Sequence, residues 1–157
     1  MPNSSAEKAQ VRHMTAADIP RAIEIAASLP EAPHWPESAY LDALNSESTP
    51  RRIALVAVGL GNVQGFALAS LLPPQAELEL IAVSAGSQRQ GMGRMLFDRL
   101  VHDLRAMGVL EIVLEVRTSN RAAVTFYRSA GFGQTGLRPA YYVDPIEDAV
   151  LMRLQLS

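Results

Sequence analysis

The stretch "LELIAVSAGSQRQGMGRML", residues 78–96, runs from an apolar strand candidate through a glycine turn into a segment of helical spacing. A strand, a glycine turn and a helix place free backbone N–H groups at a helix N-terminus, where the helix dipole adds positive charge. Such a site suits an anion, above all a phosphate. Gly91 and Gly93 would let the backbone approach a ligand, and Arg89 and Arg94 could add charge-assisted hydrogen bonds. The turn alone fits equally well a tight connection whose glycines only relieve strain.

Two common nucleotide-binding motifs fit this turn poorly. A P-loop requires a lysine directly after its last glycine, and no lysine follows here. A dinucleotide fingerprint requires a third glycine where Leu96 stands, although Glu115 lies roughly where that fingerprint places its acid. The strand before the turn belongs to an expected antiparallel meander rather than to the first unit of a parallel sheet. A nicotinamide cofactor therefore remains only a minor alternative.

The composition describes one globular domain. Of 157 residues, 48% are apolar and 19% are charged, and the formal net charge is −2 with no block of like charge. We therefore expect residues 1–10 to form a flexible tail and residues 11–157 a single domain. We expect a cytoplasmic monomer or homodimer with neither nucleic acid nor membrane as partner, because the chain has no secretory core, membrane span or basic run.

Working outward from the glycine turn, the hydrophobic pattern predicts an α/β (α+β) chain in the order β-α-α-β-β-β-α-β-α-β-β. The predicted elements are strand 11–14, helix 15–29, helix 37–45, a hairpin over 51–72, strand 76–83, a helix ending before 108, strand 111–116, helix 120–131 and strands 131–137 and 148–156. On strand 111–116, alternation places Ile112, Leu114 and Val116 on one face and Glu115 on the other.

The motif "QRQGMG" resembles the loop of the GNAT superfamily of N-acetyltransferases that holds the pyrophosphate of acetyl-CoA. From Leu80 to Met152 the chain is similar to the branch of bacterial ribosomal-protein alanine N-acetyltransferases. The motifs that carry this likeness are "LEVR-x-SN", "A-x-x-FY-x-x-x-GF" and "YY…EDA-x-x-M". The resemblance implies a GNAT fold, with a mixed, mostly antiparallel sheet of six to seven strands flanked by about four helices.

The resemblance also implies acetyl-CoA as the acyl donor and suggests which residues hold it. Backbone groups on the strand before the loop would pair with the pantetheine arm, much as a peptide adds to a sheet edge. The loop would bind the pyrophosphate, and Asn120 would cap a helix and contact the cofactor. The implied cofactor-binding residues are Ile81, Ala82, Val83, Arg89, Gln90, Gly91, Met92, Gly93, Arg94 and Asn120.

Two residues carry over as catalytic groups, each with a plain structural alternative. Glu115 would be the general base, since an acid near the end of an apolar strand is partly desolvated; otherwise it is a solvated strand-end residue or an ion-pair partner of Arg117. Tyr127 would be the general acid toward the departing thiolate; otherwise it packs beside Phe126.

The acceptor is predicted less directly. Trp35, Tyr141 and Tyr142 would line its groove, or simply pack in their loops. An α-amino group, with a pKa near 7.7–8.0, is neutral in roughly a tenth of molecules at pH 7, whereas lysine is almost wholly protonated. We therefore expect a protein N-terminal amine, such as that of a ribosomal protein. The alternatives are a small amine, amino acid or aminoglycoside acceptor, and a non-catalytic acyl-CoA-binding module. The three histidines lack metal-site spacing, so no metal is expected.

Overall fold

The computed structural model describes residues 9–88 and 90–156, and its elements follow the predicted order. They are β1 (Gln10–His13), η1 (Ala16–Asp18), α2 (Ile19–Ala27), α3 (Glu37–Leu44), β2 (Arg51–Gly59), β3 (Asn62–Leu72), β4 (Gln75–Val83), η2 (Ala85–Ser87), α4 (Met92–Ala106), β5 (Glu111–Arg117), α5 (Arg121–Ser129), β6 (Gly133–Val143) and β7 (Ile146–Gln155).

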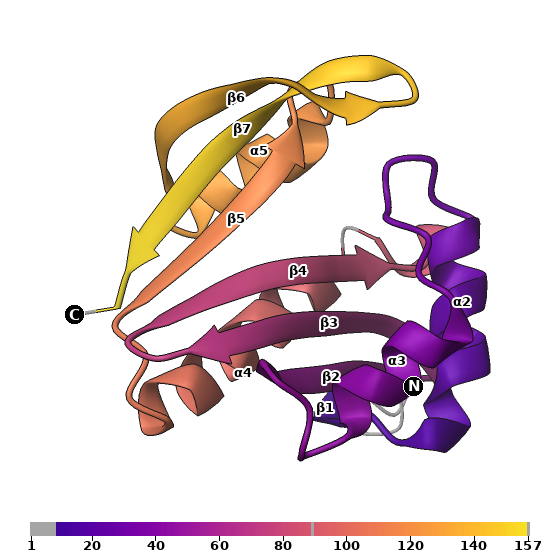
Figure 1. Ribbon diagram of the computed structural model, residues 1–157. Helices are drawn as coiled ribbons and strands as arrows, with labels where there is room; N and C mark the ends of the chain where they lie inside the picture. The colour runs from indigo at the N-terminus through magenta and orange to yellow at the C-terminus, as the bar shows by residue number, and fades with distance from the viewer. Residues whose placement is uncertain (1–8, 89, 157) are drawn as a thin grey trace.

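The strands form one seven-stranded sheet in the order β1-β2-β3-β4-β5-β7-β6. All neighbours pair antiparallel except β4 and β5, which are parallel. Figure 1 shows β4 and β5 meeting at one end and diverging toward the other, so that the sheet opens into two halves. The mixed, mostly antiparallel sheet and the α/β (α+β) class are as predicted.

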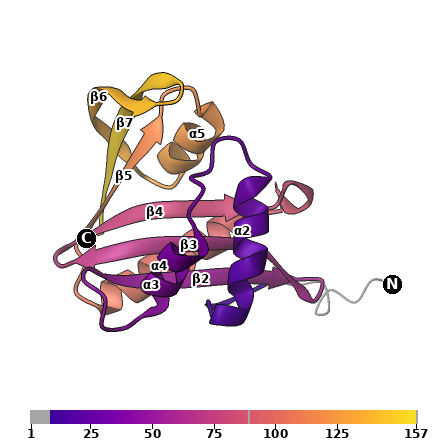
Figure 2. The ribbon, with the colours of Figure 1, turned by 45° about the vertical axis from the view of Figure 1, so that its right-hand side comes forward.

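Each face of the sheet has its own apolar core. The larger core joins α4 to β2–β5 and β7, with Leu96, Phe97, Leu100 and Leu104 of α4 fully or almost fully buried. The smaller core lies between the sheet and α2 and α3, around Tyr40 and Phe66. Figure 2 shows α2 and α3 on one face of β2–β4 and α4 on the other. As predicted, Ile112, Leu114 and Val116 are buried and Glu115 lies on the opposite face of β5.

A β-bulge in β4 is the local cause of the opening. Leu78 pairs with Ala69 of β3 and Leu80 pairs with Leu68, so Glu79 between them has no partner. The extra residue reverses the faces of the strand. Ala76 and Leu78 therefore belong to the larger core and Leu80 to the smaller one. Pairing between β4 and β5 ends at Glu77, directly before the bulge.

Several boundaries differ from the sequence prediction; for example, the predicted helix 15–29 is divided into η1 and the shorter α2. Strand β6 runs to Val143 rather than ending at residue 137, because an irregular stretch between Arg138 and Tyr142 interrupts its pairing with β7 and hides the alternation. Strand β1 begins at Gln10, inside the predicted tail, whose first eight residues lie outside the described part.

Within residues 9–88 and 90–156, no helix combines the length and apolar character of a membrane span.

Candidate active site

The separation of β4 from β5 leaves part of the β4 backbone without a strand partner on one side. Backbone polar groups alternate in direction along a strand. The Ser84 N–H donates to Gln64 of β3, and the Ala82 carbonyl also lies toward β3. The polar groups of Ile81 and Val83 therefore face the gap, where the Val83 carbonyl accepts a hydrogen bond from Gln88 Nε2 (3.0 Å). Of the three predicted backbone contacts, those at positions 81 and 83 face the gap.

A pocket of about 420 Å³ lies beside this strand end, at the N-terminus of α4. It brings together several of the predicted loop residues. Gly91, in the left-handed region at φ 80°, is the N-cap of α4, and no side chain among the described residues caps the helix. The first N–H groups of α4 therefore remain available to a ligand. The lining residues are Val83, Ser87, Gln88, Gly91, Met92, Gly93, Arg94, Phe126 and Ser129.

Other predicted loop residues are placed differently. The side chain of Gln90 donates to the Gly86 carbonyl (3.3 Å). Arg94 lines the pocket, but its Nε donates to Asp98 one turn along α4 (2.9 Å). Asn120 caps α5 as predicted, accepting from the Ala123 N–H (3.2 Å). Arg89 lies outside the described residues.

Gly65 of β3 fixes how closely β4 approaches the gap. A Cβ at this position would lie 2.9 Å from the Ala82 carbonyl oxygen and 3.2 Å from both Leu96 and Val83. We expect Gly65→Ala to displace β4, to destabilise the fold by about 1–3 kcal/mol and to weaken donor binding. Thermal unfolding and calorimetry with CoA would measure both effects. Gly136→Ala is the control, because its Cβ would make an ordinary 3.6 Å contact with Leu151; equal effects in both variants would contradict this reading.

Glu115 stands on the opposite face of the sheet from α4, among other charged groups. Its Oε1 lies 3.4 Å from Nη1 of Arg138 on β6. Hydrogen bonding to the Glu115 carboxylate raises the pKa of the Tyr141 hydroxyl. Partial burial raises the pKa of Glu77 on β4, and the charges of Glu79 and Glu115 add to the rise. Glu115 is therefore an ion-pair partner of Arg138, not of Arg117, the partner that the sequence suggested.

Tyr127 is the more buried member of the Phe126–Tyr127 pair. Its side chain packs against Phe132 with ring centroids 5.6 Å apart, and the residue is only 9% exposed. Burial raises the pKa of its hydroxyl well above the usual value, with Tyr142 nearby contributing further. The hydroxyl therefore keeps its proton at neutral pH. Phe126 instead lines the pocket at the N-terminus of α4, the predicted donor pocket, with its ring 3.6 Å from the Cβ position of Gly93.

The three predicted acceptor residues lie in two places, Trp35 at the smaller core and the two tyrosines near Glu115. Trp35, in the loop between α2 and α3, lies beside Tyr40 and under the guanidinium of Arg52 (5.8 Å to the ring). Tyr141 and Tyr142 lie on β6, with ring centroids 5.0 Å apart. Both views show the α2–α3 loop rising toward the wide end of the gap (Figures 1 and 2).

Several supporting residues were missed by the sequence reasoning. Glu147 of β7 accepts hydrogen bonds from the Ser119 N–H (2.6 Å) and the Thr118 hydroxyl (3.0 Å) and pairs with Arg117. These bonds, led by those from Ser119, lower the pKa of Glu147 to about 2. Glu147 thus ties the turn between β5 and α5 to the β6–β7 hairpin. The only hint was its place in the late "EDA" motif. No motif or spacing in the sequence marked Arg138 as a residue of the site.

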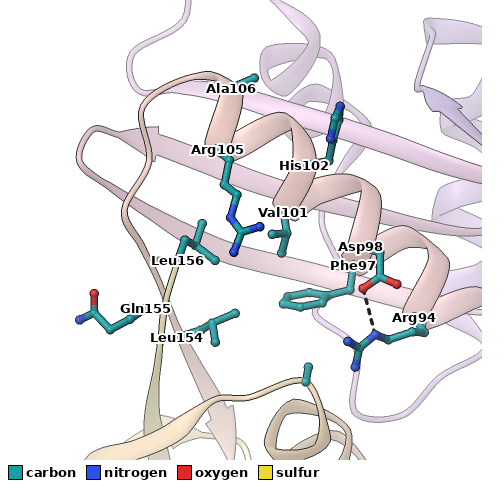
Figure 3. Close-up of a pocket in the computed structure, with 11 residues that line it drawn as sticks. Arg94, Phe97, Asp98, Val101, His102, Arg105, Ala106, Leu154, Gln155 and Leu156 are labelled. Atoms are coloured by element: carbon teal, nitrogen blue, oxygen red, sulfur yellow. Dashed lines mark hydrogen bonds and ion pairs between the residues drawn. The ribbon is translucent and has the colours of Figure 1, made fainter.

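A second cavity, of about 620 Å³, lies between α4 and the end of β7 (Figure 3). Phe97, Val101 and Leu154 form its apolar wall, and the Arg94–Asp98 pair stands at one end. Arg94 is the one predicted site residue that lines it, so this cavity adjoins the donor pocket. No three His, Asp or Glu side chains among residues 9–88 and 90–156 cluster as metal ligands.

Comparisons with known proteins agree with this geometry. The model of the Acetyltransferase (GNAT) family matches residues 19–132. The ribosomal protein bS18-alanine N-acetyltransferase of Escherichia coli (strain K12) is 41% identical over 99 residues, covering 62% of this chain and 67% of that protein. A putative enzyme of the same name from Bacillus subtilis (strain 168) is 32% identical over 150 residues, covering 96% of this chain and 97% of its own.

The folds also agree. The crystal structure of the ribosomal-protein-S18-alanine N-acetyltransferase from Escherichia coli superposes with a TM-score of 0.83 at 32% identity, covering 96% of this chain and 95% of that one. The family match spans well over half of the chain and includes the strand, loop and helix that build the donor pocket. The chain therefore belongs to the Acetyltransferase (GNAT) family and is an N-acetyltransferase.

Proposed function

We propose that this enzyme transfers the acetyl group of acetyl-CoA to the α-amino group of a protein N-terminus, and that the acceptor begins with alanine. The parting of β4 and β5 carries this proposal. It sets a pocket with free helix N–H groups on one face and Glu115 on the other. The two similar proteins described above are named as alanine N-acetyltransferases of a ribosomal protein, the one from Bacillus subtilis as a putative one, which supports the choice of acceptor.

The donor pocket fits the diphosphate and pantetheine parts of CoA. The uncapped first turn of α4 offers N–H groups to phosphate oxygens, and Gly91 brings the backbone close. Ile81 and Val83 offer strand polar groups to the amides of the pantetheine arm. When bound, acetyl-CoA supplies the activated acetyl thioester.

Glu115 and Tyr127 would then move the protons. Glu115 accepts a proton from the acceptor ammonium, directly or through water, so that the free amine can attack. Tyr127 donates toward the departing sulfur; its raised pKa keeps it protonated over the working pH range but also makes it a weak acid. The proposed base is thus a partly exposed carboxylate, and the proposed acid is a buried phenol.

Tyr127→Phe is expected to lower kcat about tenfold to a hundredfold, at the low end of general-acid effects. The loss is modest because a thiolate is already a good leaving group, with a reference pKa near 8.5. Stopped-flow detection of released thiol would measure it, with Tyr40→Phe, which removes a buried hydroxyl of the smaller core, as control. Since the raised pKa keeps Tyr127 protonated below about pH 10, it should create no basic limb in the pH profile under that value. A wild-type kcat in the variant would remove the acid role.

An acceptor screen tests the proposed function. Peptides beginning with Ala, Ser or Met would be compared with free lysine, spermidine and an aminoglycoside, using acetyl-CoA and mass spectrometry to locate the acetyl group. We expect the alanine peptide to be modified at its α-amine with the highest kcat/KM. Preference for spermidine, lysine or the aminoglycoside would assign the enzyme to small amines instead. Absence of turnover with any amine would favour an acyl-CoA-binding module.

A further inference from the structure

Arg138 forms an ion pair with the carboxylate of Glu115, the group that would accept the proton of the acceptor amine. Its Nη1 lies 3.4 Å from Glu115 Oε1, and its guanidinium carbon lies 4.9 Å from the ring centroid of Tyr141. The Glu115 side chain is 21% exposed and that of Arg138 is 53% exposed. Glu115 is thus already paired, and its cationic partner comes from the outer strand of the sheet.

The charges around this pair leave room for one more cation. Glu77 and Glu79 approach from β4, in addition to Glu115 on β5. Glu79 is engaged by Arg52 of β2 at 2.8 Å. Arg52 also lies 3.6 Å from Asp42 and acts on Glu77, whereas Arg138 is the guanidinium that pairs with Glu115. Glu77, Glu79, Glu115 and Asp42 thus share two guanidinium groups, so the cluster favours a further positive charge.

Arg138 is also easy to displace. Arg138 is the last residue of β6 that pairs with β7 before residues 139–141 leave the ladder, and the Ala140 N–H is held separately by Asp148 (2.9 Å). The exposed arginine side chain can therefore move while its backbone stays paired with Ala149. An ion pair with so exposed a partner contributes little net stability. After swinging away, the guanidinium can remain on the Tyr141 ring or beside Glu77.

We propose that Arg138 is the resident counter-ion of Glu115 and that the ammonium group of the acceptor replaces it on binding. This inference rests on the proposed role of Glu115 as the base. One ion pair breaks and one forms, so the number of ion pairs is unchanged; the ammonium proton then passes to the carboxylate. Arg138 is a positioning residue, since it acts through Glu115 and sets how readily the acceptor reaches that carboxylate.

Calorimetry in the presence of CoA tests the exchange without turnover. The probe is a hexapeptide amide that begins with alanine and has no charged side chain, so that its α-ammonium is its only charge. Arg138→Gln should bind it about three- to fivefold more tightly at low salt, because no resident cation has to leave. Arg138→Lys should stay near wild type. Arg153→Gln is the matched control: Arg153 is 49% exposed and pairs with Glu111 on the same face of β5, at 3.6 Å.

Salt dependence gives a second readout that a merely structural role would not change. Exchange of one ion pair for another should make the wild-type Kd rise only weakly between 0.05 and 0.3 M NaCl. Arg138→Gln gains a pair on binding, so its Kd should rise with salt. In a Glu115→Gln background, adding Arg138→Gln should have no further effect on Kd.

Other outcomes would overturn the counter-ion role. They are unchanged or weaker binding by Arg138→Gln, a Kd in that variant as flat with salt as the wild type, or no detectable binding in any variant. Loss of turnover in Glu115→Gln together with a wild-type Kd in Arg138→Gln would reject the counter-ion role and leave the base proposal standing. Full turnover in Glu115→Gln would reject the base proposal itself.

Discussion

Replacing Glu115 with glutamine is expected to lower kcat by about 10²–10⁴, the usual contribution of a general base. Glutamine keeps the shape of the side chain but cannot accept the ammonium proton at neutral pH. Because Glu115 lies on the face of β5 opposite the donor pocket, the affinity for CoA should stay within about twofold of wild type. Steady-state thiol release and calorimetry with CoA would measure the two quantities separately.

Glu111→Gln is the control for this variant. Glu111 lies on the same face of β5, four residues away, and pairs with Arg153 much as Glu115 pairs with Arg138. Its replacement removes the same charge at the far end of the strand, where β4 and β5 are still paired. Wild-type kcat in Glu115→Gln, or an equal loss in Glu111→Gln, would show that Glu115 is not the base.

Gly91→Asp is expected to weaken CoA binding on the order of 100-fold or more while the protein stays folded. At φ 80° the position disfavours a side chain, but a Cβ there would meet nothing within 4 Å. Aspartate is a good N-cap residue, so its carboxylate can accept from the first N–H groups of α4. This carboxylate would then occupy the position of a CoA phosphate, and its negative charge would repel the phosphates of CoA. Loss of two charge-assisted hydrogen bonds, each worth about 1.5–3 kcal/mol, accounts for this size.

Gly91→Asn tests whether the loss of CoA affinity in Gly91→Asp comes from the negative charge of aspartate or from the shape of its side chain. Asparagine tolerates the left-handed region and can cap the helix, but it carries no negative charge. We expect a loss of CoA affinity clearly smaller than that of Gly91→Asp, with similar thermal stability in both variants. Calorimetry with CoA and thermal unfolding would decide, and a Gly91→Asp protein that binds CoA within threefold of wild type would exclude the loop as the phosphate site.

The order of elements could be predicted because each has a clear local pattern. The glycine turn, the Asn120 cap and the alternation on β5 act within a few residues, and the structure confirms all three. The family motifs lie in the same part of the chain. Sequence therefore sufficed for the fold and for the place of the glycine turn beside the pocket at the N-terminus of α4.

The parts that sequence missed depend on contacts between distant residues. Ala76, Leu78, Leu80 and Ala82 alternate as in a regular strand, although the bulge at Glu79 divides them between two cores. Both faces of β4 are covered, so burial gives no sign of the reversal. Arg138 is the same kind of case, because its pairing with Glu115 joins β6 to β5 across the intervening β7.

The extra residue at Glu79, which has no partner on β3, makes the opening between β4 and β5 depend on the number of residues in β4. Its side chain contributes the ion pair with Arg52, but the reversal of the strand comes from the presence of an additional peptide unit. Substitutions at this position can therefore be tolerated as long as the strand keeps its length. A gain or loss of one residue between Glu77 and Leu80 would shift the register of β4 and allow it to rejoin β5. Tolerance of exchanges should consequently be high at position 79, whereas tolerance of insertions and deletions between Glu77 and Leu80 should be low.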